Sequence, residues 1–268
     1  MSRLKAAVIQ VCSGLVVSEN LAVIERLLMA HQQEQIDIFV LPECFAMLGG
    51  PQAEVALQAD EIREWMASTA KTLAAWFIGG AVPIRDSCDG RHHASCLVYN
   101  PEGKEVACYQ KMHLFDAEVS DGKGRYRESD DFIPGAGPEL VDIGQAKVGL
   151  SICYDLRFPE LYRYLVAQGA TVFTVPSAFT KVTGEAHWEV LLRARAIESQ
   201  CYVLAANQAG THADGRQTYG RSMIISPWGD ILAEAPAEGA GVIIAELDLA
   251  ELVRVRQQMP CLKYVLKN

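Results

Sequence analysis

A strand leads into a helix in the segment Lys147-Val148-Gly149-Leu150-Ser151-Ile152-Cys153-Tyr154-Asp155-Leu156-Arg157-Phe158-Pro159. Its first half, Lys147–Cys153, is an apolar run typical of a buried strand, and Pro159–Gln168 follows with the pattern of a helix. The next run, Ala170–Pro176, is again short and apolar. Because a strand, a helix and a second strand in succession form a parallel pair with the helix on one face, this segment predicts an α/β fold.

The same alternation extends toward both ends of the chain. The other predicted strands are Leu4–Val11, Ile36–Leu41, Trp76–Val82, Tyr202–Ala206, Ser222–Ser226 and Val242–Leu247. The other predicted helices are Glu19–Gln35, Ile62–Ala74, Glu185–Gln200 and Leu249–Gln258. Hairpin-like regions at 93–112 and 222–247 indicate mixed sheets, and 116–137 is predicted to be a polar loop. No linker interrupts the pattern, so residues 1–268 are expected to form a single domain.

The composition restricts the class of protein. The chain has 268 residues, a formal charge of −9 and 50% hydrophobic residues. It is therefore too apolar for a disordered protein and too acidic for a general binder of nucleic acids or membrane surfaces. No apolar run reaches transmembrane length, and the first residues lack the core of a signal peptide. Eight cysteines are too few for a disulfide framework, so they indicate reduced thiols in a cytoplasmic protein.

Three reactive side chains each lie at the end of a predicted strand: Cys153, Glu43 and Lys111. A cysteine at a strand-to-helix junction lies at the edge of the sheet where α/β sites form, and a helix N-terminus there favours the thiolate. Glu43 among apolar neighbours should have a raised pKa and could act as a general base. Lys111 could donate to a developing oxyanion. Each residue alone is also consistent with an ordinary role as a packed thiol, a capping glutamate or a solvated lysine.

Together the three side chains suit the hydrolysis of an amide. If they converge at one edge of one sheet, the thiol of Cys153 can attack the carbonyl carbon. The carboxylate of Glu43 can then take and return protons, and the ammonium of Lys111 can stabilise the tetrahedral oxyanion. The sequence therefore predicts an enzyme with a cysteine nucleophile.

Three segments carry a resemblance to a known family. They are Leu41-Pro42-Glu43, Tyr109-Gln110-Lys111-Met112-His113-Leu114-Phe115-Asp116 and Gly149-Leu150-Ser151-Ile152-Cys153-Tyr154-Asp155-Leu156-Arg157-Phe158-Pro159-Glu160-Leu161. Each resembles one signature segment of the nitrilase superfamily of carbon–nitrogen hydrolases, with its catalytic residue in place. The resemblance extends from Leu4 to Pro260, nearly the whole chain.

The resemblance implies a fold and a set of catalytic residues. The fold is a four-layer αββα sandwich with mixed sheets, which associates into a homodimer through its helices. Cys153 would be the nucleophile, Glu43 the general base and Lys111 the group that stabilises the oxyanion. Glu128 matches a second glutamate of the omega-amidase branches.

The resemblance also implies residues that bind the substrate. The backbone N–H of Tyr154 resembles the second oxyanion donor of the family. Arg157, Phe179 and Thr183 resemble the residues that hold the acid end of the substrate, and an arginine suits a carboxylate because its planar fork can donate to both oxygens.

The substrate depends on the branch of the superfamily. The segment 198–212 most resembles the deaminated glutathione amidases, which predicts an amidase for the omega-amide of a small 2-oxo acid, deaminated glutathione. An omega-amidase that acts on 2-oxoglutaramate is the alternative. Polar residues of 116–137 and 207–221 are expected to line the opening for the larger leaving group. Arg221 departs from the histidine usual in the family, and the tail after Pro260 lacks the usual basic ending.

Two other hypotheses compete with this interpretation. The first is a zinc site, for which the candidate ligands are Cys88, His92, His93 and Cys96. Their spacing fits no common structural zinc pattern, so we expect no metal and no other cofactor. The second is a non-catalytic binding module of the same fold, which would be expected to lack Cys153 or Glu43. The expected partners are a small-molecule amide and a second copy of the chain, with no nucleic acid or membrane.

Three side chains of the helix 185–200 are expected to be structural. His187 is predicted to pack beside the site, because Glu43 already fills the role of the base. Arg193 and Arg195 are predicted to form an ion-pair face.

Overall fold

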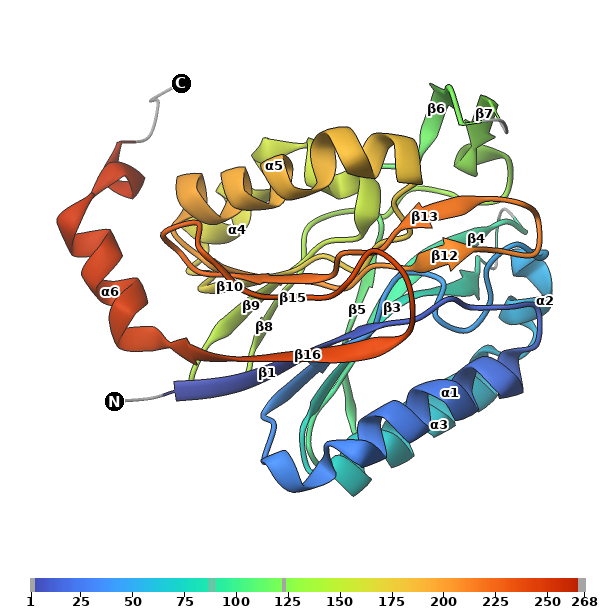
Figure 1. The fold of residues 1–268 in the computed structure, drawn as a ribbon, viewed down its shortest axis with the longest axis horizontal. Helices are drawn as coiled ribbons and strands as arrows, with labels where there is room; N and C mark the ends of the chain where they lie inside the picture. Colours follow the sequence, from blue (N-terminus) through green and yellow to red (C-terminus); the bar gives the residue numbers. More distant parts are fainter. Residues whose placement is uncertain (1–2, 87, 89, 122–123, 265–268) are drawn as a thin grey trace.

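Two mixed β-sheets lie face to face, and helices cover the outer face of each sheet (Figure 1). The computed structural model describes residues 3–86, 88, 90–121 and 124–264. The larger hydrophobic cluster contains the side chains buried between the sheets and those beneath the helices of the second sheet, and another cluster lies beneath the helices of the first sheet. The predicted αββα sandwich with mixed sheets is confirmed.

The first sheet has six strands in the order β16-β1-β2-β3-β4-β5. Their bounds are β1 Arg3–Gln10, β2 Ile38–Val40, β3 Trp76–Arg85, β4 His92–Tyr99, β5 Glu105–Gln110 and β16 Gly241–Asp248. Strands β1, β2 and β3 are parallel, while β4, β5 and β16 are joined to their neighbours in antiparallel pairs. Strand β5 is antiparallel to β4 and therefore runs in the same direction as β3.

The second sheet has the order β15-β14-β11-β10-β9-β8. Its strands are β8 Leu140–Asp142, β9 Lys147–Leu150, β10 Val172–Thr174, β11 Tyr202–Ala205, β14 Met223–Ile225 and β15 Ile231–Glu234. The central strands β9, β10 and β11 are parallel and fully or almost fully buried, as expected for apolar runs covered on both faces.

The helices and two small hairpins complete the molecule. The α-helices are α1 Val17–Ala30, α2 Gln52–Ala56, α3 Ala59–Leu73, α4 Pro159–Ala167, α5 Lys181–Ser199 and α6 Leu249–Gln258. The 3₁₀ turns are η1 Gln32–Glu34, η2 Glu128–Asp130, η3 Cys153–Arg157 and η4 Cys261–Lys263. The hairpin strands are β6 Asp116–Val119, β7 Gly124–Arg127, β12 Ala209–Thr211 and β13 Gln217–Tyr219. Helices α1 and α3 cover the first sheet, and α4 and α5 cover the second (Figure 1).

Several predicted elements differ from the observed ones. Helix α1 begins two residues before the predicted Glu19 and ends at Ala30, five residues before the predicted Gln35, and α3 begins three residues before the predicted Ile62. The supposed loop at 116–137 contains the hairpin β6–β7 and the turn η2, whose polar composition hid the strands. Helix α5 begins at Lys181 because the side chain of Thr180 accepts the backbone N–H of Thr183 and caps the helix four residues earlier than predicted. Within the described residues, no helix is long and apolar enough to span a membrane.

Candidate active site

Three segments bring Glu43, Lys111 and Cys153 to the same end of the sandwich. Glu43 follows the carboxyl end of β2 in the first sheet, and Cys153 follows the carboxyl end of β9 in the second sheet. Lys111 comes directly after the last residue of β5 in the first sheet. All three side chains line one cavity. The prediction that they meet at the edge of a single sheet was wrong, because Glu43 and Lys111 come from the first sheet and Cys153 from the second.

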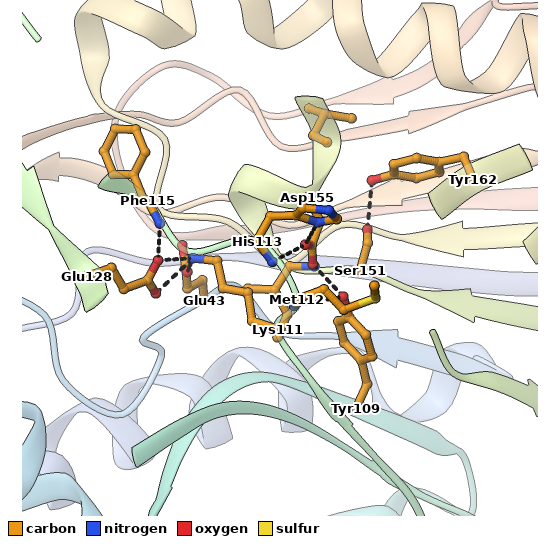
Figure 2. Close-up of polar contacts among 12 residues, drawn as sticks. Glu43, Tyr109, Lys111, Met112, His113, Phe115, Glu128, Ser151, Asp155 and Tyr162 are labelled. Carbon is orange, nitrogen blue, oxygen red and sulfur yellow. Dashed lines mark hydrogen bonds and ion pairs between the residues drawn. The ribbon is translucent and has the colours of Figure 1, made fainter. Parts of the chain in front are cut away.

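A buried ammonium joins two carboxylates at the centre of this site (Figure 2). The Nζ of Lys111 donates to Glu43 Oε1 at 2.8 Å and to both Glu128 oxygens at 2.9 Å. The side chain of Lys111 is only 1% exposed and that of Glu43 is 8% exposed. The other Glu43 oxygen accepts the backbone N–H of Ala178 at 2.9 Å. Because water is nearly excluded, these charge-assisted hydrogen bonds fix the carboxylates in place.

Cys153 begins the turn η3 in a strained backbone conformation. Its φ of 47° lies in the left-handed region that residues other than glycine rarely adopt. Its backbone N–H donates to the carbonyl of Pro176 at 2.8 Å, which holds this conformation in place. The chain therefore turns sharply after β9, and Cys153 lines the cavity at that turn.

The thiol of Cys153 is protonated at rest. Burial raises its pKa well above 9.0 and the negative charge of Glu43 raises it further, while Lys111 and the N–H of Ala178 lower it. The expectation of a thiolate favoured by a helix N-terminus was therefore wrong, because desolvation and the neighbouring carboxylate dominate. A neutral thiol needs a base, and Glu43 is the candidate because its carboxylate lines the same cavity and acts on the pKa of the thiol.

The charges of Lys111 and Glu128 shift each other's pKa values. Burial alone would lower the pKa of Lys111, but the charges of Glu128 and Glu43 raise it well above 10.5, so the amine stays protonated. Burial raises the pKa of Glu128 above 4.5, and the charge of Glu43 acts in the same direction against the opposing effect of Lys111. The site therefore concentrates negative charge around one permanent cation.

Asp155 anchors the turn that carries the nucleophile to the end of β5 (Figure 2). It is fully buried and accepts the hydroxyl of Tyr109 and the backbone N–H of Ile152, at 2.7 and 2.9 Å. Its other oxygen accepts the backbone N–H of His113 at 3.1 Å and contacts Nδ1 of the same residue at 2.7 Å. This network could not be predicted from the sequence, because only the tertiary fold brings the two segments together.

Two of the three structural predictions for helix α5 need correction. Arg195 is 5% exposed and, besides pairing with Glu198, donates from Nε and a terminal nitrogen to the carbonyl of Leu156 within η3. Arg195 therefore holds the turn η3, which carries Cys153, in place and is not part of an exposed ion-pair face. His187 is exposed, and its Nδ1 lies 3.3 Å from a nitrogen of Arg157, so it is a contact of the site and not a packing residue.

The four predicted substrate-binding residues line the same cavity, whose volume is about 580 Å³. The guanidinium of Arg157 lies 5.7 Å from the ring centroid of Tyr154 and 5.3 Å from that of Phe179. Thr183 is in the first turn of α5, with its hydroxyl 2.9 Å from that of Thr180. A cation held against aromatic rings beside a hydroxyl suits an anionic end of a substrate.

The cavity also receives side chains from both segments expected to line its opening. Strand β7 contributes Arg125, Tyr126 and Arg127, and the loop between β12 and β13 contributes Asp214 and Arg216. The sequence does not single out these residues, because nothing in the local pattern distinguishes one polar loop residue from another. Among the described residues, no group of three or more His, Cys, Asp or Glu side chains is placed to hold a metal ion.

Arg221, the departure from the family pattern, lies outside this cluster. Its guanidinium forms ion pairs with Glu234 and Glu189, and its carbonyl accepts the indole N–H of Trp188 at 2.8 Å. Arg221 therefore joins helix α5, which carries Glu189 and Trp188, to strand β15, which carries Glu234.

Comparisons with known proteins agree with this geometry. The family model described as carbon-nitrogen hydrolase matches residues 5–257, and the chain belongs to that family. The protein is accordingly a hydrolase that acts on amides.

Two curated relatives and one solved structure are similar to nearly the whole of this chain. Deaminated glutathione amidase of Synechocystis is 43% identical over 97% of both chains. Omega-amidase NIT2-B of Xenopus laevis is 36% identical over 97% of this chain and 94% of that protein. The crystal structure of the Caenorhabditis elegans NitFhit protein matches this chain with a TM-score of 0.92 and 36% sequence identity. The match covers 99% of this chain and 65% of the NitFhit chain.

Proposed function

We propose that this hydrolase cleaves deaminated glutathione into a 2-oxo acid and an amine through an acyl-thioester on Cys153. The observation that carries the proposal is the contact of one buried lysine with both Glu43 and Glu128 in the cavity that Cys153 lines. A protonated thiol, a carboxylate beside it and a permanent cation are the groups that amide hydrolysis by a cysteine requires.

The first half of the reaction forms the thioester. Glu43 takes the thiol proton as Sγ of Cys153 attacks the carbonyl carbon. The resulting oxyanion accepts hydrogen bonds from Lys111 and from the backbone N–H of Tyr154, because the first N–H groups of a helical turn lack partners within the turn. When the intermediate collapses, the C–N bond breaks and the amine leaves with the proton that Glu43 held.

The second half releases the acid. Glu43 takes a proton from water, and the hydroxide formed attacks the thioester carbonyl. The second oxyanion accepts the same hydrogen bonds, the C–S bond breaks, and Cys153 regains its proton from Glu43. Glu128 shares the ammonium of Lys111 throughout and holds it in position.

Two observations support deaminated glutathione as the substrate. Relatives from Yersinia enterocolitica and Synechocystis, 38% and 43% identical, are deaminated glutathione amidases. A cavity of about 580 Å³ is large enough for an acyl group and a dipeptide leaving group together. The likeness to an omega-amidase keeps 2-oxoglutaramate as the second candidate.

The test is product formation by the purified protein. Deaminated glutathione, 2-oxoglutaramate, an N-carbamoyl amino acid and a simple nitrile are compared by kcat/KM for the wild type and for Cys153→Ala. We expect deaminated glutathione to give the highest value and the alanine variant to be inactive. A preference of tenfold or more for 2-oxoglutaramate would assign the protein to the alternative. Activity of Cys153→Ala would refute the thioester, and a wild type that hydrolyses nothing in the panel would favour the binding module.

We further propose a homodimer in the cytoplasm. Apolar side chains are exposed on α5 and beside it, with Val190 68%, Ile197 47% and Trp228 52% exposed. Such a patch on a helical layer is typical of a surface that a second copy covers. The exposed free thiols of Cys12, Cys108 and others support a reducing compartment.

A further inference from the structure

A row of three aromatic rings follows the cavity, with an arginine at each end. Phe115 is the middle ring, and its centroid lies 5.0 Å from those of both Tyr154 and Tyr126. The guanidinium of Arg157 lies 5.7 Å from the ring centroid of Tyr154, and that of Arg216 lies 5.2 Å from the ring centroid of Tyr126. All five side chains line the cavity.

The middle of this row lies at the catalytic cluster. The backbone N–H of Phe115 donates to Glu128 Oε2 at 2.6 Å, and the other partner of that carboxylate is Lys111 (Figure 2). An amide that reacts at this cluster therefore has one cation on each side along the row. The end near Arg157 also holds the residues proposed to bind the acyl part, so the end near Arg216 faces the leaving amine.

Arg216 has unused hydrogen-bonding capacity. Its Nε is buried and has no hydrogen-bond partner among the described residues. One terminal nitrogen lies 3.8 Å from Asp214 Oδ2, which is an ion-pair distance but beyond a hydrogen bond. The guanidinium is instead held by the ring of Tyr126, and its side chain is 22% exposed. A partly buried cation with so few hydrogen bonds is costly, and an anion of the substrate would satisfy it.

We infer that Arg216 determines specificity by binding a carboxylate on the leaving amine. The inference rests on the proposed function and extends it to a class of substrate: amides in which both the acyl part and the amine part carry a carboxylate. The cysteinylglycine part of deaminated glutathione has such a group at its C-terminus. Ammonia, the amine released from 2-oxoglutaramate, has none.

The two arginines of β7, Arg125 and Arg127, are less suited to this role. Arg127 already donates to the carbonyl of Tyr126 at 3.0 Å and lies 3.9 Å from Glu118. Arg125 is exposed and lies opposite Glu118 in the β6–β7 ladder. Arg125 therefore contributes charge at the rim of the cavity without a fixed position, which makes it a charge-matched comparison for Arg216.

The experiment compares deaminated glutathione with its C-terminal carboxamide, which keeps the scissile amide and removes the second carboxylate. The 2-oxo acid released is quantified for the wild type, Arg216→Gln and Arg125→Gln. We expect the wild type to favour the free acid in kcat/KM by about 10- to 100-fold, as for a charged hydrogen bond. Arg216→Gln should reduce this ratio to within about threefold of one, and Arg125→Gln should keep most of it.

Each outcome decides the inference. A wild type that hydrolyses both compounds equally would overturn the role of Arg216 and leave the proposed function intact. That ratio is decisive even if Arg216→Gln does not fold. An unchanged ratio in Arg216→Gln, or an equal loss in Arg125→Gln, would also overturn it. A wild type that hydrolyses neither compound but accepts 2-oxoglutaramate would refute the proposed substrate and the inference together.

Discussion

Single residues set the protonation states on which the chemistry depends. The thiol of Cys153 and the ammonium of Lys111 are both stabilised in their protonated forms, the first mainly by burial and the second by two carboxylates. This arrangement differs from a preformed thiolate, because the proton leaves only when Glu43 accepts it during attack. Catalysis therefore depends on the geometry between a neutral acid and a fixed base.

These protonation states predict a flat pH profile on the alkaline side. The raised pKa values mean that Cys153 stays neutral above pH 9.0 and that Lys111 stays charged above pH 10.5. As pH rises from about 7 to about 9, neither required form is lost, so kcat/KM should stay constant. The check is kcat/KM for the best amide substrate over that range. A rise or a fall with a midpoint inside it would contradict these assignments.

Replacing the base should remove most of the activity. Glu43→Gln keeps the shape of the side chain but cannot accept the thiol proton, so kcat should fall by about 10²- to 10⁴-fold. Glu118→Gln, on the exposed side of β6, is the control and should retain wild-type kcat. Steady-state kinetics and thermal melting of both variants make the comparison. If Glu43→Gln retained near wild-type kcat while folded, Glu43 would not be the base.

At the scale of elements, close backbone packing positions Glu43. Strand β3 passes directly beneath the segment that carries the base. A Cβ atom on Gly80 would lie 2.1 Å from the carbonyl oxygen of Pro42 and 2.7 Å from the backbone nitrogen of Glu43. Only a glycine allows this close approach, so β3 fixes the position of the Glu43 backbone relative to the first sheet.

Gly80→Ala should consequently damage stability and activity together. The methyl group must displace the backbone at Pro42 and Glu43, which should lower the free energy of unfolding by about 1–3 kcal/mol. A displacement of about 1 Å at the base should lower kcat by up to about 10²-fold. Gly137→Ala, where no atom lies within 4 Å of the added methyl, is the matched control. Urea unfolding and kinetics of both variants are the measurements, and wild-type values for Gly80→Ala would contradict the packing argument.

The strands and helices that could be predicted from sequence are those with an apolar face. Strands such as Lys147–Leu150 and helices such as Pro159–Ala167 were recognised because burial imposes a periodic pattern. The hairpin strands β6, β7, β12 and β13 are short and lie outside both main sheets, so they carry no such pattern. Glu43, Lys111 and Cys153 could be singled out because each lies at or just past the end of a strand and within a segment that resembles a signature of the family. Asp155 and Arg216 could not, because their partners are distant in sequence.

At the scale of the whole molecule, the exposed apolar patch on α5 predicts the oligomeric state. The wild type should sediment with about twice the chain mass of 29.3 kDa. A charge at the patch should dissociate the dimer, because burying an unpaired carboxylate is costly. Val190→Asp should therefore be a monomer at micromolar concentration, whereas Leu57→Asp, on the exposed turn between α2 and α3, should remain dimeric. A monomeric wild type would contradict the proposed interface.

The central claim is that Cys153 carries the acyl group of the substrate. The most direct test is mass spectrometry of the enzyme quenched during turnover of deaminated glutathione, followed by peptide mapping. We predict that the peptide containing Cys153 gains the mass of one 2-oxoglutaryl group, and that Glu43→Gln, which is slow in both half reactions, shows less product per unit time. An acyl group on another cysteine, such as the neighbouring Cys44, or turnover without any acylated enzyme in rapid-quench samples, would contradict the claim.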